Sequence, residues 1–257
     1  MTPPTADLRA ACWELAGQCT AVAERGAPGF ESALRAGAWH VLTTTGEAGN
    51  WFAFHGDTPA ITAQARELAD RLDALQTSAG GWVSPAVIET VMGALGETPV
   101  NRWGVSPLML CEGRPRERVG TPYAGTVRAA RADEAGLAFG VIAHAFGVPE
   151  EATASIWTEA VDRPGMTVHL AEHDGIESVC VAYTPADLCY IYVMATEPDR
   201  QRRGAGYAVL SHVMNGLVDR GIDRFTLLAS GQGRPLYEAM GYDVIDAAEF
   251  WSLNRPS

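Results

Sequence analysis

Glycine and arginine residues lie close together in one short segment of the C-terminal half, Gln201-Arg202-Arg203-Gly204-Ala205-Gly206. Gly204 and Gly206 can adopt positive φ angles, and their lack of a side chain lets a ligand approach the backbone closely. An apolar run at 190–194 precedes the segment and a helix-patterned stretch follows it, which predicts a strand-to-helix turn. The free N–H groups of such a turn, the helix dipole and the arginine side chains all favour a bound anion, most simply a pyrophosphate.

Other phosphate-binding turns fit this sequence poorly. The nucleotide P-loop requires Gly-x-x-x-x-Gly-Lys-Ser/Thr, and the chain contains no lysine. The dinucleotide-binding fingerprint requires a third glycine three residues after Gly206, where this chain has Val209. A tight strand-to-helix corner with solvated arginines is the remaining alternative, and it binds no ligand.

The segment resembles the GNAT superfamily of acyl-CoA-dependent N-acyltransferases. The superfamily signature Arg/Gln-x-x-Gly-x-Gly/Ala is matched by Gln201, Gly204 and Gly206. A second signature, Leu-Tyr-x-x-x-Gly-Phe/Tyr, is matched by residues 236–242 at a compatible spacing. Two separated motifs are far more specific than either alone. The strong part of the resemblance spans residues 190–242.

The resemblance implies that acetyl-CoA is the acyl donor and that a defined set of residues binds it. Backbone groups of residues 194–196 would hold the pantetheine arm and the acyl carbonyl, because a main-chain N–H directed at a developing oxyanion is a strong catalytic device. Residues 202–207 would hold the pyrophosphate. Ser230 would be a polar contact, although a turn role at a strand end fits it equally well. The implied donor-binding residues are Met194, Ala195, Thr196, Gln201, Arg202, Arg203, Gly204, Ala205, Gly206, Tyr207 and Ser230.

Catalytic roles are implied for tyrosines. Tyr237 occupies the superfamily position of the acid that protonates the departing coenzyme A thiolate. Glutamates that act as the general base in related enzymes are replaced here by Tyr190 and Phe225. A water chain past Tyr190 or Tyr192, or a carboxylate such as Glu172 from another element, could take over the role of the base.

A cysteine nucleophile and a metal site are not expected. Cys189 would lie on the strand face opposite Tyr190, and free cysteines are mostly small buried hydrophobic residues. His169 and His173 are four residues apart on a predicted strand, so their side chains would not converge on a metal ion. The five cysteines contain no Cys-x-x-Cys spacing, which favours reduced thiols in the cytoplasm.

Composition limits the classes of partner. The net charge of −12 argues against nucleic acids and anionic membranes, and it suits a cationic acceptor as well as it suits ordinary solubility. No apolar run approaches the length of a membrane span, and residues 1–7 lack the pattern of a signal peptide. We therefore expect a cytoplasmic protein that acts on a small-molecule or peptide amine. A homodimer is compatible with the sequence.

The C-terminal half is predicted to be a complete GNAT domain, residues 121–257, with a mixed, mostly antiparallel sheet flanked by helices. The predicted strands are 126–131, 166–172, 178–183, 188–194, 224–228, 242–245 and 249–253. The predicted helices are 132–146, 149–161, 204–220 and 234–240. The first helix is expected to bury Leu137, Val141, Ile142 and Phe146 on one face.

The N-terminal half, residues 1–115, resembles a degenerate copy of the same domain, so the predicted fold class is α/β (α+β) with two GNAT-like domains in tandem. Strands are predicted at 39–44, 51–54, 80–83 and 106–111, and helices at 62–75 and 85–95. The segment before the first of these helices, 55–60, has neither arginines nor paired glycines, so this half is predicted not to bind pyrophosphate. An unrelated helical cap is the alternative.

The predicted function is transfer of an acetyl group from acetyl-CoA to an amine in a ternary complex. One alternative is a non-catalytic module that senses acyl-CoA. Another is a GNAT-fold enzyme that transfers a longer acyl group or cleaves the thioester. The acceptor pocket of the superfamily is built from its variable first helices and strand-pair loops, so the sequence does not identify the acceptor.

Overall fold

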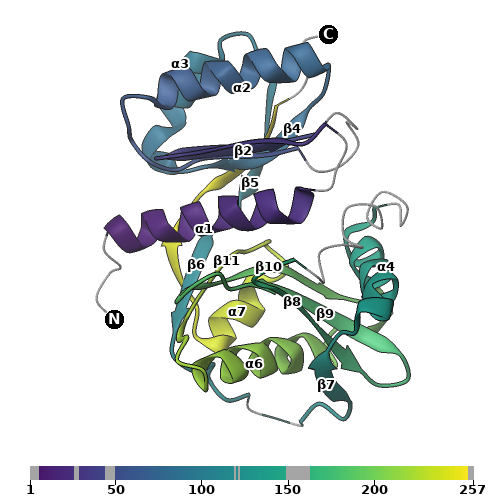
Figure 1. The fold of residues 1–257 in the computed structure, drawn as a ribbon. Coiled ribbons are helices and arrows are strands. Elements are labelled where there is room, and N and C mark those ends of the chain that lie inside the picture. The colour runs from purple at the N-terminus through teal and green to yellow at the C-terminus, as the bar shows by residue number, and fades with distance from the viewer. Residues whose placement is uncertain are drawn as a thin grey trace. The chain divides into compact units, whose positions relative to one another are not determined.

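A computed structural model describes residues 6–25, 29–43, 50–118, 120, 122–148 and 163–253. The chain divides into two compact units, one formed by Met1–Leu108 with Val244–Ser257 and the other by Met109–Asp243. Each unit is organised around one sheet flanked by helices (Figure 1), which confirms the predicted mixed α/β class. The helix predicted at 149–161 lies outside the described residues.

The sheet of the second unit has the strand order β12-β6-β11-β10-β9-β8-β7. Neighbouring strands from β7 to β10 pair antiparallel, whereas β10 and β11 pair parallel. The sheet is therefore mixed and mostly antiparallel along this run, as predicted. The strands are β6 (Leu108–Glu112), β7 (Thr126–Ala129), β8 (Met166–Glu172), β9 (Ile176–Tyr183), β10 (Cys189–Thr196), β11 (Arg224–Leu228) and β12 (Asp243–Asp246).

Helices cover both faces of this sheet. On β9, Cys180 and Ala182 join the core cluster that includes residues of helices α6 and α7. Val179 and Val181 alternate with them and are equally buried, because α4 also packs against β9. A strand that is covered on both faces shows a continuous apolar run rather than alternation. The helices are α4 (Ala135–Phe146), α6 (Ala205–Val218) and α7 (Arg234–Met240).

The buried face of α4 differs from the prediction. Leu137 and Phe146 are 64% and 57% exposed, whereas Val141 and Ile142 are buried as expected. The remaining buried positions of this helix are Phe139 and several alanines. Small side chains allow the helix to lie close to the sheet, so the pattern of large apolar residues pointed to the wrong face.

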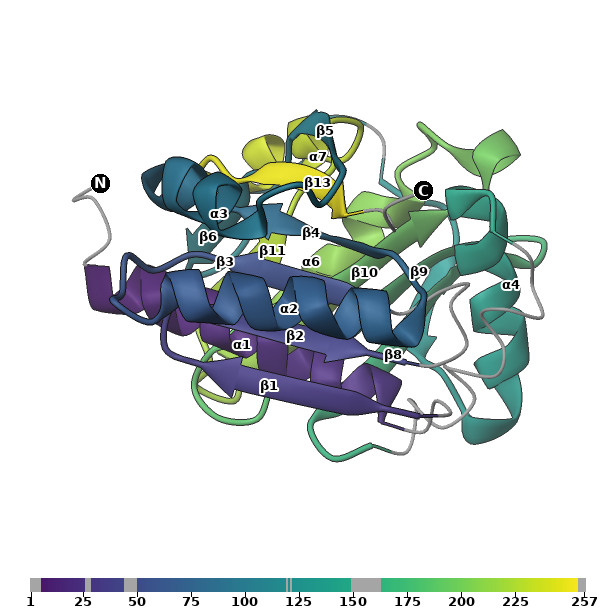
Figure 2. The same cartoon turned by 90° about the horizontal axis from the view of Figure 1, so that it is seen from above.

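The first unit has a sheet with the order β1-β2-β3-β4-β13-β5. Figure 1 shows α2 and α3 on one face of this sheet and α1 on the other, and Figure 2 shows α2 lying over β2. The strands are β1 (Glu31–Arg35), β2 (Ala38–Leu42), β3 (Trp51–Phe54), β4 (Ala79–Val83), β5 (Val100–Val105) and β13 (Glu249–Leu253). The helices are α1 (Ala6–Glu24), α2 (Ile61–Leu75) and α3 (Ile88–Leu95).

The elements missed in this half are α1, β1 and β5. Helix α1 buries residues around most of its circumference, so its sequence shows no single apolar stripe. Strands β1 and β5 are mostly exposed or half-buried and lack an apolar alternation. Among the helices that the structure describes, none is both long enough and apolar enough to cross a membrane.

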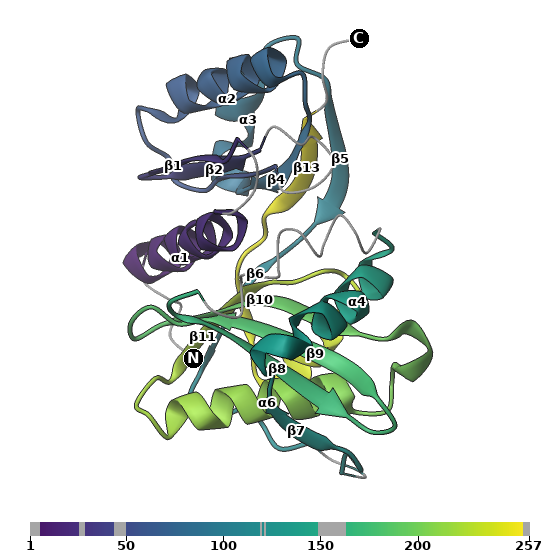
Figure 3. The same cartoon turned by 45° about the vertical axis from the view of Figure 1, so that its right-hand side comes forward.

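The last strand of each half belongs to the sheet of the other unit. Strand β6 ends the N-terminal half, yet it lies between β11 and β12 in the second sheet. Strand β13 ends the chain, yet it pairs antiparallel with both β4 and β5 in the first sheet (Figure 3). The assignment of 249–253 to a C-terminal domain of 121–257 is thereby corrected. Strand pairing over such sequence separations leaves no trace in local sequence patterns.

The two halves nevertheless share one order of elements. The first runs β1-β2-β3-α2-β4-α3-β5-β6, and the second, from β8 onward, runs β8-β9-β10-α6-β11-α7-β12-β13. Each half has a parallel pair around its central helix, β3 with β4 and β10 with β11. This correspondence supports the prediction of two related halves.

Residues 121–257 expressed alone should not fold cooperatively. This fragment lacks β6, so β11 and β12 lose the strand between them, and β13 loses both of its partners. Unpaired strand edges are sites of aggregation. We expect no cooperative urea transition by circular dichroism, whereas residues 106–246, which retain the complete second sheet, should give one. A cooperative transition for 121–257 would contradict the importance of this strand exchange.

Candidate functional site

The parallel strands β10 and β11 separate shortly after they meet. Their pairing consists of Cys189 with Phe225 and Tyr190 with Thr226, although β10 continues to Thr196. On its other edge β10 remains paired with β9 as far as Thr196. Beyond Tyr190, β10 forms no further ladder pair with β11 among the described residues. The predicted residues 194–196 lie on this open edge.

A β-bulge accompanies the separation. The register between β9 and β10 shifts between Ile191 and Val193, which leaves Tyr192 as an extra residue. Bulges bend a strand and increase its local twist. At the end of β10, the buried Ser178 hydroxyl donates to the carbonyl of Ala195 at 2.7 Å and lies 2.9 Å from the Thr196 hydroxyl. These bonds hold the end of β10 against β9.

The turn between β10 and α6 contains two residues in the left-handed region. Arg202 has φ 66° and Gly204 has φ 95°. Left-handed residues turn successive backbone N–H groups towards one side, which makes an anion-binding concavity. Gly204 immediately precedes α6, so the positive end of the helix dipole adds to this effect. The predicted turn is therefore present, with strained backbone at Arg202.

Gly206 serves close approach rather than a left-handed conformation, because it lies inside α6. A Cβ atom at this position would stand 3.3 Å from Thr196 Oγ1, 3.7 Å from Leu236 Cδ2 and 3.8 Å from Met194 Cε. The Gly206 position is thus closely surrounded by residues of β10 and α7, and a larger side chain there would press on Thr196.

The sequence did not predict the residues that support the turn through side-chain contacts. Glu177 is 2% exposed, accepts a hydrogen bond from Tyr123 at 3.0 Å and pairs with Arg200 Nη1 at 3.1 Å. Burial, together with this carboxylate, raises the pKa of Tyr123 well above its usual value. Arg200 lies directly before the turn, so the buried carboxylate holds one end of the turn in place. Local sequence patterns gave no signal for these contacts, because they join residues far apart in the chain.

Other predicted donor-binding residues in the turn already have partners. Arg203 Nη2 donates to the carbonyl of Asp199 at 3.0 Å, and Gln201 Oε1 accepts from Gln232 at 3.1 Å. The hydroxyl of Tyr207 donates to the carbonyl of Arg116. Their backbone groups, rather than these occupied side-chain atoms, are then the available donors.

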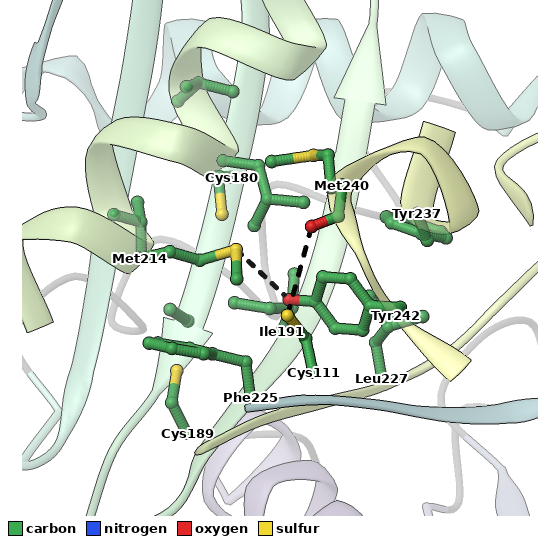
Figure 4. Close-up of a cluster of buried hydrophobic side chains, with 14 of the residues drawn as sticks. Cys111, Cys180, Cys189, Ile191, Met214, Phe225, Leu227, Tyr237, Met240 and Tyr242 are labelled. Carbon is green, nitrogen blue, oxygen red and sulfur yellow. Dashed lines mark hydrogen bonds between the residues drawn. The ribbon is translucent and has the colours of Figure 1, made fainter. Parts of the chain in front are cut away.

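Tyr237 lies at the margin of the core cluster drawn in Figure 4, where it packs edge-on against Tyr242 with ring centroids 5.8 Å apart. Burial raises the pKa of Tyr237 well above its usual value. Its hydroxyl has no hydrogen-bond partner among the residues that the structure describes. The hydroxyl of Tyr242, in contrast, donates to Met214 Sδ at 3.5 Å inside the core.

Ser230 has the turn role at a strand end that the sequence also allowed. Its hydroxyl accepts the backbone N–H of Gly233 at 3.0 Å, at the start of α7. Such bonds are typical of Ser in turns. This bond satisfies a backbone N–H at the start of α7, the helix that carries Tyr237.

The remaining candidate groups are poorly suited to accept a proton. Burial raises the pKa of Cys189 to about 12, so the thiol stays protonated at neutral pH. Both oxygens of Glu172 accept hydrogen bonds from Arg128, at 2.7 and 3.0 Å, so this carboxylate is already engaged by an arginine. Tyr190 is 4% exposed and stands at the point where the two strands part. Within the described ranges there is no cluster of metal-ligating side chains.

Comparisons with known proteins identify the family of this site. Residues 140–251 match the family model of the acetyltransferase (GNAT) domain. No curated protein matches the sequence. The resemblance seen in the sequence is confirmed by this match, and the chain contains a GNAT-type acetyltransferase domain.

Solved structures share the fold at low sequence identity. A GCN5-related N-acetyltransferase from Kribbella flavida has a TM-score of 0.68 at 13% identity, with 95% of each chain covered. One from Sphaerobacter thermophilus has a TM-score of 0.61 at 15% identity, covering 87% of this chain and 79% of that one. A tandem GNAT protein from the clavulanic acid biosynthesis pathway has a TM-score of 0.58 at 14% identity, covering 98% and 97%.

Gly206→Glu should abolish the thermal protection that coenzyme A gives to the protein. The new side chain would enter the space between Thr196 and Leu236, and its charge would repel a pyrophosphate. The matched control is Gly216→Glu, which adds the same charge to the same helix at an exposed position with open space around it. Protection that persists in Gly206→Glu, measured by a thermal shift, would contradict this location of the site.

Proposed function

We propose that the GNAT acetyltransferase domain of this chain, matched over residues 140–251, transfers an acetyl group from acetyl-CoA to an amine by direct transfer. The observation that carries the proposal is the early separation of β10 from β11 beside the left-handed turn at 202–204. The acceptor proposed is a small-molecule or peptide amine. The net charge of −12 is compatible with a cationic one.

The site offers a continuous path for an extended thioester donor. The open edge of β10 presents backbone N–H and C=O groups that can pair with the amide groups of a pantetheine arm, as a missing strand would. Gly206 has no side chain to block the way from that edge to the turn, where even a Cβ atom would stand 3.3 Å from Thr196 Oγ1. The turn and the start of α6 then supply N–H groups and a positive dipole end for the pyrophosphate.

In the reaction, the nitrogen of the neutral amine attacks the thioester carbonyl carbon and the C–N bond forms. Negative charge develops on the carbonyl oxygen, where a backbone N–H of residues 194–196 stabilises it. The C–S bond then breaks, and its electron pair goes to the sulfur. The proton lost from nitrogen passes to water, for which a chain past Tyr190 is the proposed route.

Tyr237 is proposed to act on the leaving sulfur. The resemblance to the family assigns this position to the leaving sulfur, and the Tyr237 ring is held edge-on against Tyr242. A thiol has an ordinary pKa of about 8.5. Because the pKa of Tyr237 is raised well above its usual value, complete proton transfer from the phenol to a free thiolate is unfavourable. We therefore propose that Tyr237 donates a hydrogen bond that strengthens as charge builds on sulfur.

The first unit is proposed to bind no acyl-CoA. Its corresponding strands β3 and β4 stay paired from Trp51 to Phe54, and the bond from Ser84 N to Phe54 O at 2.8 Å continues the ladder. No backbone edge is left open there. Ala60, which precedes α2, has φ −84°, so the start of this helix lacks the left-handed turn.

Titration calorimetry of the full chain with coenzyme A should give one site per polypeptide. The open strand edge and the left-handed turn occur together in the second unit, and the closed ladder of β3 and β4 leaves no equivalent space in the first. The same titration of Gly206→Glu is the control and should show no binding. A stoichiometry of two would contradict the proposed inactivity of the first unit.

Tyr237→Phe should lower kcat by about 10²-fold, while KM for acetyl-CoA changes little, because a hydrogen bond to developing charge acts mainly in the transition state. The substitution keeps the ring against Tyr242 and removes only the hydroxyl. The matched control is Tyr242→Phe, which removes a hydroxyl bonded to Met214 within the core and should leave kcat nearly unchanged. Near-full kcat in Tyr237→Phe, measured by release of free thiol, would show that the sulfur leaves unaided.

A further inference from the structure

The segment that follows β6 runs along helix α6 towards its N-terminal end. Arg114 binds the side chains of Asn215 and Asp219 near the end of the helix. Two residues later, the carbonyl of Arg116 accepts the hydroxyl of Tyr207 in the first turn of the helix. The N–H of Arg116 also donates to the carbonyl of Met240 at 3.0 Å. The chain is therefore fixed on both sides as it approaches the turn.

At the end of this segment, the guanidinium group of Arg118 lies directly against Gly204. A Cβ atom added to Gly204 would overlap with Arg118 Nη1 and would stand 2.8 Å from Cζ. Any other residue at 204 would displace the guanidinium group. The φ of 95° favours glycine at 204, and the absence of a side chain there is what allows this close contact with Arg118.

The charge of Arg118 is not neutralised by the protein. Its side chain is exposed and has no ion pair or hydrogen bond within the described part of the chain. The same holds for Arg202, which lies in the turn itself. Other arginines of this unit bind carboxylates, among them Arg114, Arg128 and Arg200. Uncompensated cations beside the positive end of a helix dipole repel one another, and a bound anion removes that repulsion.

We propose that Arg118 is a further phosphate-binding residue of the donor site and that it binds the pyrophosphate of acetyl-CoA. The inference rests on the proposed function and adds to it a residue from the segment between the two halves. Arginine binds phosphate through paired N–H groups in a planar fork. The pyrophosphate, rather than another phosphate of the donor, is assigned because Gly204 borders the backbone N–H groups of the turn.

The test compares Arg118→Ala with the unaltered protein in calorimetric titrations of coenzyme A and 3′-dephospho-coenzyme A. Loss of a charge-assisted contact should raise Kd for both ligands by the same factor, roughly tenfold to a hundredfold. Arg118→Lys keeps the charge but loses the fork, so its Kd values should fall between the two. The kcat at saturating donor should change less than about twofold, since this interaction is made equally in the ground and transition states.

Arg66→Ala is the matched control, since it removes one exposed positive charge from α2 of the first unit and should leave both Kd values unchanged. The inference on Arg118 is overturned if Arg118→Ala binds both ligands normally. It is also overturned if the loss is confined to coenzyme A, which would assign Arg118 to the 3′-phosphate. Failure of the proposed function is distinct, because the unaltered protein would then bind neither ligand.

Discussion

The early end of the hydrogen-bond ladder between β10 and β11 is the constraint on which the site depends. Parallel strands normally pair along their shared length. These two pair only at Cys189 and Tyr190 of β10 and then separate. Backbone groups left open in this way are costly unless something satisfies them. A ligand with amide groups of its own can do so. We therefore propose that the backbone of β10 supplies binding energy for an extended donor, which would make side-chain identity less important along this edge.

Holding two strands apart requires that each be fixed on its far side. Strand β10 is held by β9, and the bulge at Tyr192 in this pairing bends the strand just after it leaves β11. Strand β11 is held by β6, with the Thr226 hydroxyl donating to the carbonyl of Met109 at 2.9 Å. Because β6 is the last strand of the N-terminal half, that half supplies part of the frame of the site. The exchange of terminal strands therefore joins the folding of the two halves.

The elements of the second unit and the turn of the candidate site could be predicted from local sequence. The other features depend on long-range contacts. The Gly204 turn and the helix carrying Tyr237 are encoded within a few residues, so the sequence indicated them directly. Glu177 and Arg118 reach the turn from distant segments, and no local pattern marks them. The exchange of β6 and β13 was missed for the same reason. The exposed face of α4 was misjudged because its alanines, rather than its largest residues, contact the sheet.

Two closely packed glycines, one in each half, have different roles. In the first unit, a Cβ on Gly81 of β4 would overlap with the carbonyl of Phe52 and stand 2.5 Å from Cγ of its ring. The glycine there admits an aromatic side chain between paired strands, and Phe52 is fully buried. In the second unit, Gly206 lies against Thr196, beyond the point where the ladder between β10 and β11 ends. The glycine beside the closed ladder therefore serves packing, whereas the one beside the interrupted ladder belongs to the proposed donor site.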